Sequence, residues 1–341
     1  MAAMPVRYDA VLLVSFGGPE GMDDVMPFLA NVVRGRNVPP ERLQQTAAHY
    51  AHFGGQSPLP AQTRALVAAL EQELQAHGPR LPVYLGNRNW HPFLADTLRQ
   101  MAADGVTRAL AFFTSAYGSY SGCRQYLENI AAARAEVGAQ APEVDKLRAF
   151  YNHPGFVEPL VELVGEALGR IEAPRRDAAR LVFTAHSLPK ALAAASPYEA
   201  ELRETAGLVA GRLGRPEFAL VYQSRSGPPG QPWLEPDIVE HLRALASQGV
   251  KDVVVAPIGF LSDHMEVVYD LDTDARARAL ELGLNLVRAA TVGTHPRFVR
   301  MIRELVVERI EDAALRPALG VRGPAPDECA PGCCLAARPR P

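Results

Sequence analysis

The segment Leu181-Val182-Phe183-Thr184-Ala185-His186-Ser187-Leu188-Pro189 decides the fold and contains the first candidate site residue. Its first five residues are apolar or β-branched, which is typical of a buried strand, and Pro189 marks a turn. His186 is therefore expected at the carboxyl end of a strand. Ligands of open α/β sheets bind at this edge, so a titratable imidazole here is a candidate site residue. A lone histidine could equally cap a helix or fill a polar niche in the core.

A second apolar run repeats this placement. Residues 253–258 read as a strand, and Asp263, His264 and Glu266 follow within one turn. The carboxyl ends of parallel strands meet at one edge of a sheet. Two strand ends therefore bring a histidine and an acidic cluster to one rim, which favours a functional site.

Strand-like and helix-like runs alternate along the whole chain, which predicts an α/β fold with parallel sheets covered by helices on both faces. We expect strands near residues 9–15, 82–86, 108–114, 146–150, 181–185, 218–223, 251–257 and 284–288. We expect helices near residues 22–34, 58–77, 92–104, 121–137, 155–172, 196–214, 235–248, 264–282 and 296–312.

The chain also repeats itself weakly. Residues 11–16 resemble 181–186, and residues 83–88 resemble 220–225. A Gly-Val pair precedes a strand in both parts of the chain, at Gly105 and at Gly249. The repeat predicts two similar Rossmann-like halves with a cleft between them.

The expected domain limits follow from this repeat. We expect an N-terminal half over 1–150, a C-terminal half over 151–317 that contains His186 and Glu266, and a cysteine-bearing tail over 318–341. The first half has roughly thirty extra residues between its first two strands, which we assign to an insertion near 35–57. An insertion at the ligand edge of a sheet usually belongs to the site.

Composition excludes several classes of protein. The chain has 341 residues, 48% of them hydrophobic and 21% charged, as in a globular protein. A formal net charge of -3 provides no basic surface for nucleic acid. No apolar run is long enough for a transmembrane segment or a signal peptide, so we expect a cytoplasmic protein. Gly17-Gly18-Pro19 lacks the spacing of a dinucleotide-binding loop.

Carboxylates recur at four-residue intervals after the second candidate strand. Glu266, Asp270 and Asp274 would lie along one face of a helix, and a π-bulge would align them more closely. A solvated acidic face is the plainer interpretation. However, the row begins beside an apolar strand end, where solvation is poorest. A line of carboxylates leading to a histidine is suited to passing a hard divalent cation or protons.

The predicted insertion and the turn after it are rich in groups that bind anions. Ser57 before Pro58 is a fair helix N-cap, which is its structural role. A helix N-terminus with arginines nearby also suits carboxylates or phosphates. The insertion and its start include Arg34, Arg36, Arg42, His49 and Tyr50.

Four cysteines form the last candidate site. Cys329, Cys333 and Cys334 lie close to the C-terminus, and Cys123 is the only other cysteine. In a reducing compartment such a group favours a metal site over disulfides. Four cysteine ligands match either an iron–sulfur cluster or a zinc ion, and free thiols on a disordered tail are the plainer alternative.

Four motifs together resemble the ferrochelatases, over about residues 8–312: 15–19, 54–59, 184–189 and 262–269. The resemblance implies that ferrous iron, a substrate, is inserted into a porphyrin bound between the two halves. It implies that His186 and Glu266 face each other across the cleft as the iron- and proton-handling pair, with Asp270 and Asp274 as a relay. Porphyrin contacts are expected at Ser57, Tyr126, Phe16, Arg34 and His49. Phe16 stands where some bacterial relatives have an iron-ligating tyrosine, so its ring can only pack on the porphyrin.

The tail resembles the cluster-binding C-terminus of actinobacterial and animal ferrochelatases. This resemblance implies a 2Fe-2S cluster held by Cys123, Cys329, Cys333 and Cys334, and coproporphyrin III as the substrate. Protoporphyrin IX is the alternative substrate. A non-catalytic porphyrin or haem carrier would have no use for the acidic row, and a cobalt chelatase of the same fold would be expected to lack the cysteine tail. We expect a monomer that passes its product to a downstream enzyme of haem synthesis.

Overall fold

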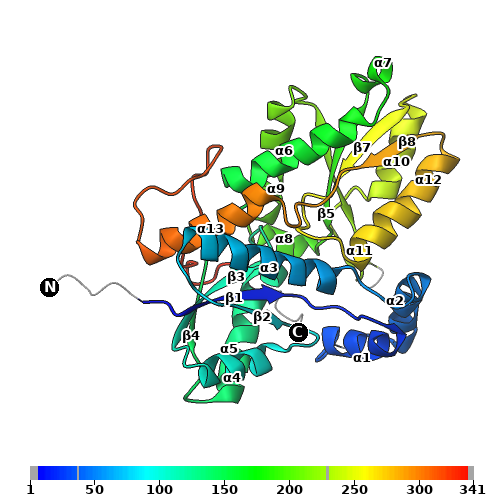
Figure 1. Cartoon of the computed structure of the whole chain (residues 1–341). Coiled ribbons are helices and arrows are strands. Elements are labelled where there is room, and N and C mark those ends of the chain that lie inside the picture. Colours follow the sequence, from blue (N-terminus) through cyan, green and yellow to red (C-terminus); the bar gives the residue numbers. More distant parts are fainter. Residues whose placement is uncertain (1–6, 37, 228–229, 337–341) are drawn as a thin grey trace.

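The two halves each contain one parallel sheet, and the two sheets have the same strand order. The computed structural model describes residues 7–36, 38–227 and 230–336. The first sheet has the order β2-β1-β3-β4 and the second β6-β5-β7-β8, four strands in each, and Figure 1 shows them one above the other. The predicted α/β fold with two similar halves is confirmed. The strands are β1 (Ala10–Ser15), β2 (Val83–Asn87), β3 (Arg108–Phe113), β4 (Glu143–Lys146), β5 (Arg180–His186), β6 (Phe218–Gln223), β7 (Asp252–Ala256) and β8 (Asn285–Arg288).

Helices cover both faces of each sheet. Those of the first half are α1 (Met22–Val32), α2 (Pro40–His52), α3 (Leu59–His77), α4 (Leu94–Ala103), the π-helix η1 (Tyr120–Arg124) and α5 (Gln125–Val137). The later ones are α6 (Pro154–Gly169), α7 (Ala173–Arg176), α8 (Lys190–Ala194), α9 (Tyr198–Arg212), α10 (Ile238–Ser247), α11 (Met265–Val267), the π-helix η2 (Val268–Ala275), α12 (Arg276–Glu281) and α13 (Pro296–Ile310).

One continuous core joins the halves. In β1, Val11 and Leu13 face this shared core, whereas Leu12 and Val14 face a separate core under α4 and α5. Side chains of α3, α6, α9 and α13 fill the shared core, and α13 packs against both α3 and α6. Strands buried on both faces explain why the sequence shows near-continuous apolar runs rather than an alternating pattern.

The fourth strand lies earlier than expected. Its pairing ends at Ala111 with Lys146, so the prediction of a strand over 146–150 is wrong. The chain leaves the sheet there because Phe150 stacks on Phe112 and Arg148 forms an ion pair with α13. The apolar residues of 146–150 correctly predicted burial, but they do not pair as a strand.

Several helices also differ from the prediction. The insertion contains helix α2, whose weak apolar pattern buries only Tyr50. The helix expected over 264–282 is divided by the π-helix η2. The short helices α7 and α8 were not predicted. In the part of the chain that the structure describes, no helix is long and apolar enough to cross a membrane. The domain limits near 150 and 317 stay predictions.

A buried ion pair fastens α13 to the end of the first sheet. Arg148 Nε lies 2.6 Å from Glu308 Oε1, and the two side chains are 1% and 6% exposed. Arg148 Nη2 also donates to the carbonyl oxygen of Pro317, at 2.9 Å. A single arginine therefore holds both α13 and the start of the tail.

We predict that Glu308→Gln lowers the free energy of unfolding by about 3–5 kcal/mol, because it leaves the Arg148 charge buried without a partner. Urea denaturation measures this loss. The control is Arg297→Ala, which breaks an exposed pair with Glu158 and should cost no more than about 1 kcal/mol. Equal losses in the two variants would contradict the assignment.

Candidate functional site

His186 and Glu266 form an ion pair at the edge of the second sheet. His186 is the last residue of β5, and Glu266 lies in α11, shortly after β7. His186 Nε2 is 3.4 Å from Glu266 Oε1, with the side chains 30% and 47% exposed. Both residues therefore belong to the C-terminal half and lie side by side. That they face each other across a porphyrin cleft stays a prediction.

Backbone contacts fix the orientation of the imidazole. His186 Nδ1 donates to the Ser187 carbonyl oxygen at 2.5 Å, which directs Nε2 towards Glu266. The Tyr198 hydroxyl donates to the His186 carbonyl oxygen at 3.0 Å. On the other side, His264 caps α11 by accepting a hydrogen bond from the Glu266 N–H at 3.1 Å. A neighbouring residue in the chain therefore orients each member of the pair, Ser187 for His186 and His264 for Glu266.

The pair is charged in the free protein. Burial disfavours the imidazolium, but the Glu266 charge and hydrogen bonds to Glu266 and Ser187 outweigh it and raise the pKa of His186 to about 9. Burial likewise disfavours the carboxylate, yet His186 lowers the pKa of Glu266 to about 2. The pair's stabilisation is therefore lost as the pH rises through about 9 or falls through about 2.

The acidic row runs from this pair towards solvent. Asp270 lies in the π-helix η2 and accepts a hydrogen bond from the Ser224 hydroxyl, while Asp274 is exposed. Gln223, at the end of β6, donates to the Glu266 carbonyl oxygen at 2.6 Å and so joins the row to the second sheet. Burial, aided by the Glu266 charge, raises the pKa of Asp270 to about 7.

The insertion packs directly against the row. His49 of α2 stacks on Tyr269 of η2, with ring centroids 3.7 Å apart. Tyr50 is buried in one cluster with Met265, and its pKa is raised by burial and by the Glu266 charge. The N-terminal half therefore contributes one wall of the site.

A polar pocket of about 200 Å³ lies in the N-terminal half. It contains three guanidinium groups and four side-chain amides, a combination that suits carboxylates. Arg34, which the sequence singled out, is among its lining residues. These are Asn31, Val32, Arg34, Arg36, Arg88, Asn89, Phe93, Gln125 and Asn129.

Arg88 is a site candidate that the sequence reasoning missed. Its guanidinium lies 4.5 Å from the ring centre of Tyr126 and 5.7 Å from that of Phe16. It also donates to Asn129 at 2.7 Å. Its place directly after β2, at the ligand edge of the sheet, was the signal that could have found it.

Two expected porphyrin contacts are largely enclosed in this structure. Ser57 accepts a hydrogen bond from the Leu59 N–H at the start of α3, at 3.3 Å. Tyr126 is 4% exposed and packs between Phe113 and Arg88. Their contacts with a porphyrin stay predictions.

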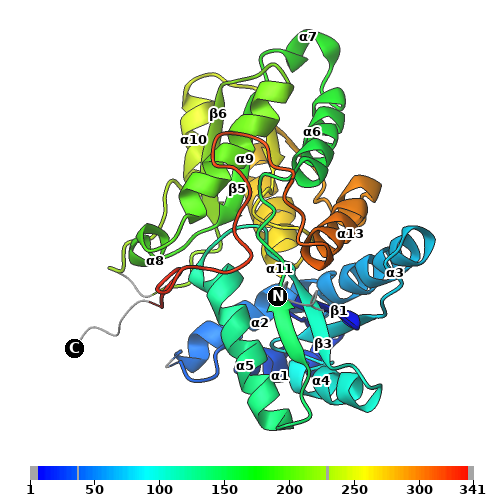
Figure 2. The ribbon, with the colours of Figure 1, turned by 90° about the vertical axis from the view of Figure 1, so that its left-hand side faces the viewer.

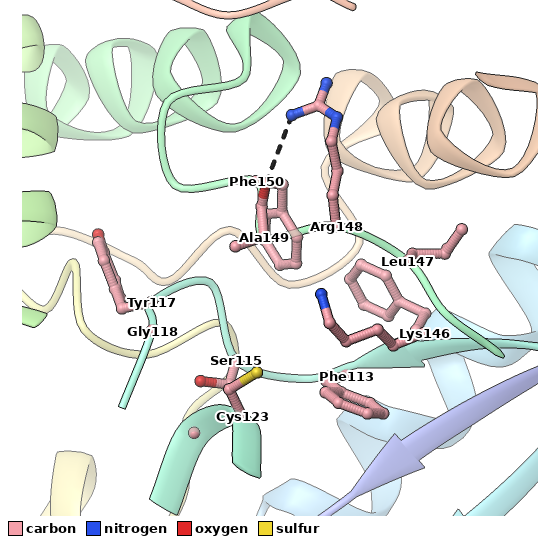
Figure 3. A pocket seen from close by; sticks show the side chains of 12 residues that line it. Phe113, Ser115, Tyr117, Gly118, Cys123, Lys146, Leu147, Arg148, Ala149 and Phe150 are labelled. Atoms are coloured by element: carbon pink, nitrogen blue, oxygen red, sulfur yellow. Dashed lines mark hydrogen bonds between the residues drawn. The ribbon is translucent and has the colours of Figure 1, made fainter. Parts of the chain in front are cut away.

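The four cysteines gather at the junction of the tail and η1, and all are free thiols. Cys329 lies beside Cys123 and Cys333, and the Cys333 and Cys334 sulfurs are 3.4 Å apart. Cys123 and Lys146 line a small pocket (Figure 3). The hydrogen bond from Cys123, together with the Lys146 charge, lowers the pKa of Cys329 to about 5. Over the described residues, no group of three or more potential ligands has the arrangement of a metal site.

Known proteins with similar sequences show the family of this chain. The ferrochelatase family pattern matches residues 8–310. A ferrochelatase of Rhodopirellula baltica is 53% identical, over 100% of this chain and 97% of the relative. A coproporphyrin III ferrochelatase of Nocardia farcinica is also 53% identical, over 97% of both chains, and one of Streptomyces griseus is 51% identical, over 99% and 96%.

Solved structures with a similar fold are chelatases. SirB of Bacillus subtilis with Fe3+ has a TM-score of 0.54 at 14% identity, over 90% of this chain and 97% of SirB. The sirohydrochlorin chelatase SirB of Bacillus subtilis subspecies spizizenii with cobalt gives 0.52, at the same identity and coverage. These likenesses support the two-domain fold alone. From the family match and the identities over full length, this chain belongs to the ferrochelatase family.

Proposed function

We propose that this protein inserts Fe²⁺ into coproporphyrin III to give iron-coproporphyrin III. The observation that carries the proposal is the His186–Glu266 ion pair at the ligand edge of the second sheet, continued by a row of carboxylates. The relatives named coproporphyrin III ferrochelatase, at 51–53% identity, support this substrate. A non-catalytic carrier would have no use for the pair or the row.

The reaction exchanges two pyrrole N–H protons for one dication, so two protons must leave the porphyrin centre. In the free protein the imidazolium of His186 cannot accept a proton. An approaching Fe²⁺ repels the imidazolium, so His186 first gives its Nε2 proton to Glu266, and this proton leaves through Asp270 to solvent before the pyrrole protons are taken up. Neutral Nε2, held towards the reacting centre by the Ser187 contact, can then accept one pyrrole proton or bind the metal. Glu266 can accept the other proton.

The row gives the protons and the metal a route between the pair and solvent. Asp270, with a pKa of about 7, exchanges protons readily at neutral pH. Asp274 lies at the exposed end and would meet a hydrated cation first. His49 stacks on Tyr269, which lies between Glu266 and Asp270 in the sequence, and this contact helps to fix the N-terminal half against the row.

The arginine pocket would bind the carboxylates of the porphyrin. Arg34, Arg36 and Arg88 present guanidinium groups that can bind propionates through paired hydrogen bonds. Phe16 is partly exposed beside Arg88 and offers an apolar face for the macrocycle. Ser57, Tyr126 and His49 remain further candidate contacts.

We predict that His186→Ala and Glu266→Gln fold normally, still bind coproporphyrin III and lose nearly all iron insertion. Glu266→Gln keeps the shape of the side chain and removes its charge. Anaerobic incubation with Fe²⁺ and either coproporphyrin III or protoporphyrin IX, followed by absorbance, measures the rate.

The matched control is Asp177→Asn, which removes an exposed carboxylate far from the row in sequence and should leave the rate unchanged. Normal turnover by either site variant would refute the assignment. Faster metallation of protoporphyrin IX than of coproporphyrin III by the wild-type protein would make protoporphyrin IX the substrate.

We further infer that Cys123, Cys329, Cys333 and Cys334 hold a 2Fe-2S cluster. Four free thiols share one region of the molecule, and four thiolates are the ligand set of this cluster type. The pKa of Cys329 is lowered, whereas the pKa of Cys123 and that of Cys334 are raised, so binding of the cluster would have to deprotonate these two thiols. The tail is brought to Cys123 by its own contacts, since Arg124 Nη1 donates to the Cys333 carbonyl oxygen at 3.1 Å. Such a cluster supplies a one-electron redox centre. Reduced thiols also fit the expected cytoplasmic location.

If the four residues share one cluster, anaerobically purified protein should be red-brown, and Cys→Ser at any of the four should bleach it equally. Proteolysis should then open residues 328–336, whereas residues 317–323 stay protected, because Arg148, Asn152 and Glu204 hold that stretch without cysteine. Colourless protein with one bound zinc ion would show that the four cysteines form a zinc site and not a cluster site. Colour that survives Cys123→Ser would remove that residue from the ligand set.

A further inference from the structure

Helix α9 contacts three functional segments through one of its faces. Tyr198, Glu201 and Glu204 are three residues apart, so they lie along the same side of the helix. Tyr198 donates to the backbone of His186. Glu201 accepts from the loop that precedes Cys123. Glu204 accepts from the Val321 N–H of the tail, which Figure 2 shows running across α9.

Glu201 is the unusual member of this set, because it is a buried carboxylate. It is 6% exposed, and its Oε2 accepts a hydrogen bond from the Gly118 N–H at 2.6 Å. Burial raises its pKa to about 7. A carboxylate is costly to bury, so its retention here needs a reason beyond packing. The iron-insertion chemistry proposed above does not use it.

The loop that Glu201 holds lies directly on the start of α9. A Cβ atom on Gly118 would lie 2.8 Å from Pro197 Cγ and 3.4 Å from Glu201 Oε2. Only glycine therefore allows this approach. Pro197 immediately precedes Tyr198, so the loop and the His186 contact meet at the same end of one helix.

Beyond Gly118, two hydrogen bonds of Ser119 connect the loop to Cys123. Ser119 caps the π-helix η1 by accepting from the Gly122 N–H at 2.9 Å. The Cys123 N–H donates to the Ser119 carbonyl oxygen, also at 2.9 Å. In the other direction, the Tyr117 hydroxyl donates to the Ile258 carbonyl oxygen at 3.0 Å, after β7. A displacement of the loop would therefore move Cys123.

We propose that Glu201 is a positioning residue that couples the cysteine site to His186 through helix α9. Its carboxylate fixes the Cys123 loop on the helix end that holds the His186 backbone, so a change at the cysteines alters how firmly the imidazole is held. The role for iron insertion rests on the function proposed above. The coupling itself is a property of the fold and is measured without turnover.

Hydrogen exchange of the full-length protein, purified anaerobically, tests this coupling. In Glu201→Ala, amides of residues 114–124 and of 186–190 should both exchange about tenfold faster, equivalent to about 1.4 kcal/mol of local opening. In Glu201→Gln, the exchange rates of both segments should stay near those of the wild type, because the amide oxygen of glutamine can still accept the hydrogen bond from the Gly118 N–H. In the insertion assay, kcat should fall in Glu201→Ala while the KM for porphyrin stays unchanged.

The matched control is Glu204→Ala, one turn along the same helix. It should accelerate exchange in residues 318–323 and leave 114–124 and 186–190 as in the wild type. If Glu201→Ala does not fold, Gly118→Ala keeps the carboxylate and pushes the loop off α9, and it should give the same two-segment pattern. Acceleration confined to 114–124 would overturn the proposal.

A double-mutant cycle measures the coupling energy itself. Cys123→Ser should accelerate exchange at 186–190 in the wild-type background and add nothing in Glu201→Ala. Additive effects would overturn the proposal. These exchange measurements need no porphyrin and no iron. If the proposed function is wrong, the exchange measurements still test the coupling. If the coupling is absent, the proposed function is unaffected.

Discussion

The contact between His186 Nε2 and Glu266 Oε1 is the interaction on which the account of this site depends. It exists because β5 and β7 are parallel neighbours, so the residues that follow both strands meet at one edge of the second sheet. Removing either charge leaves its partner half-buried and changes its protonation. The fold therefore sets both the place and the charge state of the reactive pair.

In the proposed function, the two halves contribute different parts of the site. The C-terminal half supplies the ion pair and the carboxylate row, and the N-terminal half supplies the arginine pocket and the aromatic residues around Phe16. The shared core and α13 hold the halves together, while α9 lies between the cysteines and His186. This arrangement suits a reaction that needs a rigid site for a macrocycle in one half and a path for a cation in the other.

Much of this arrangement could be predicted from the sequence, because buried parallel strands leave apolar runs and residues such as His186 follow them directly. The repeat predicted two similar halves. Contacts between segments that are far apart in the chain cannot be predicted from a local sequence pattern of this kind. Nothing local shows that Arg88 joins Arg34, or that Glu201 is buried. The π-helix was anticipated only as a way of aligning carboxylates, since no residue pattern specifies it.

The measurement that tests the central claim most directly is an NMR titration of ¹⁵N-labelled histidine in the wild-type protein and in Glu266→Gln. The account predicts a His186 pKa of about 9 in the wild type. It predicts a lower value in the variant, where burial is no longer outweighed by the Glu266 charge. A wild-type pKa near the ordinary 6.5, unchanged by the substitution, would contradict the ion pair and the mechanism built on it.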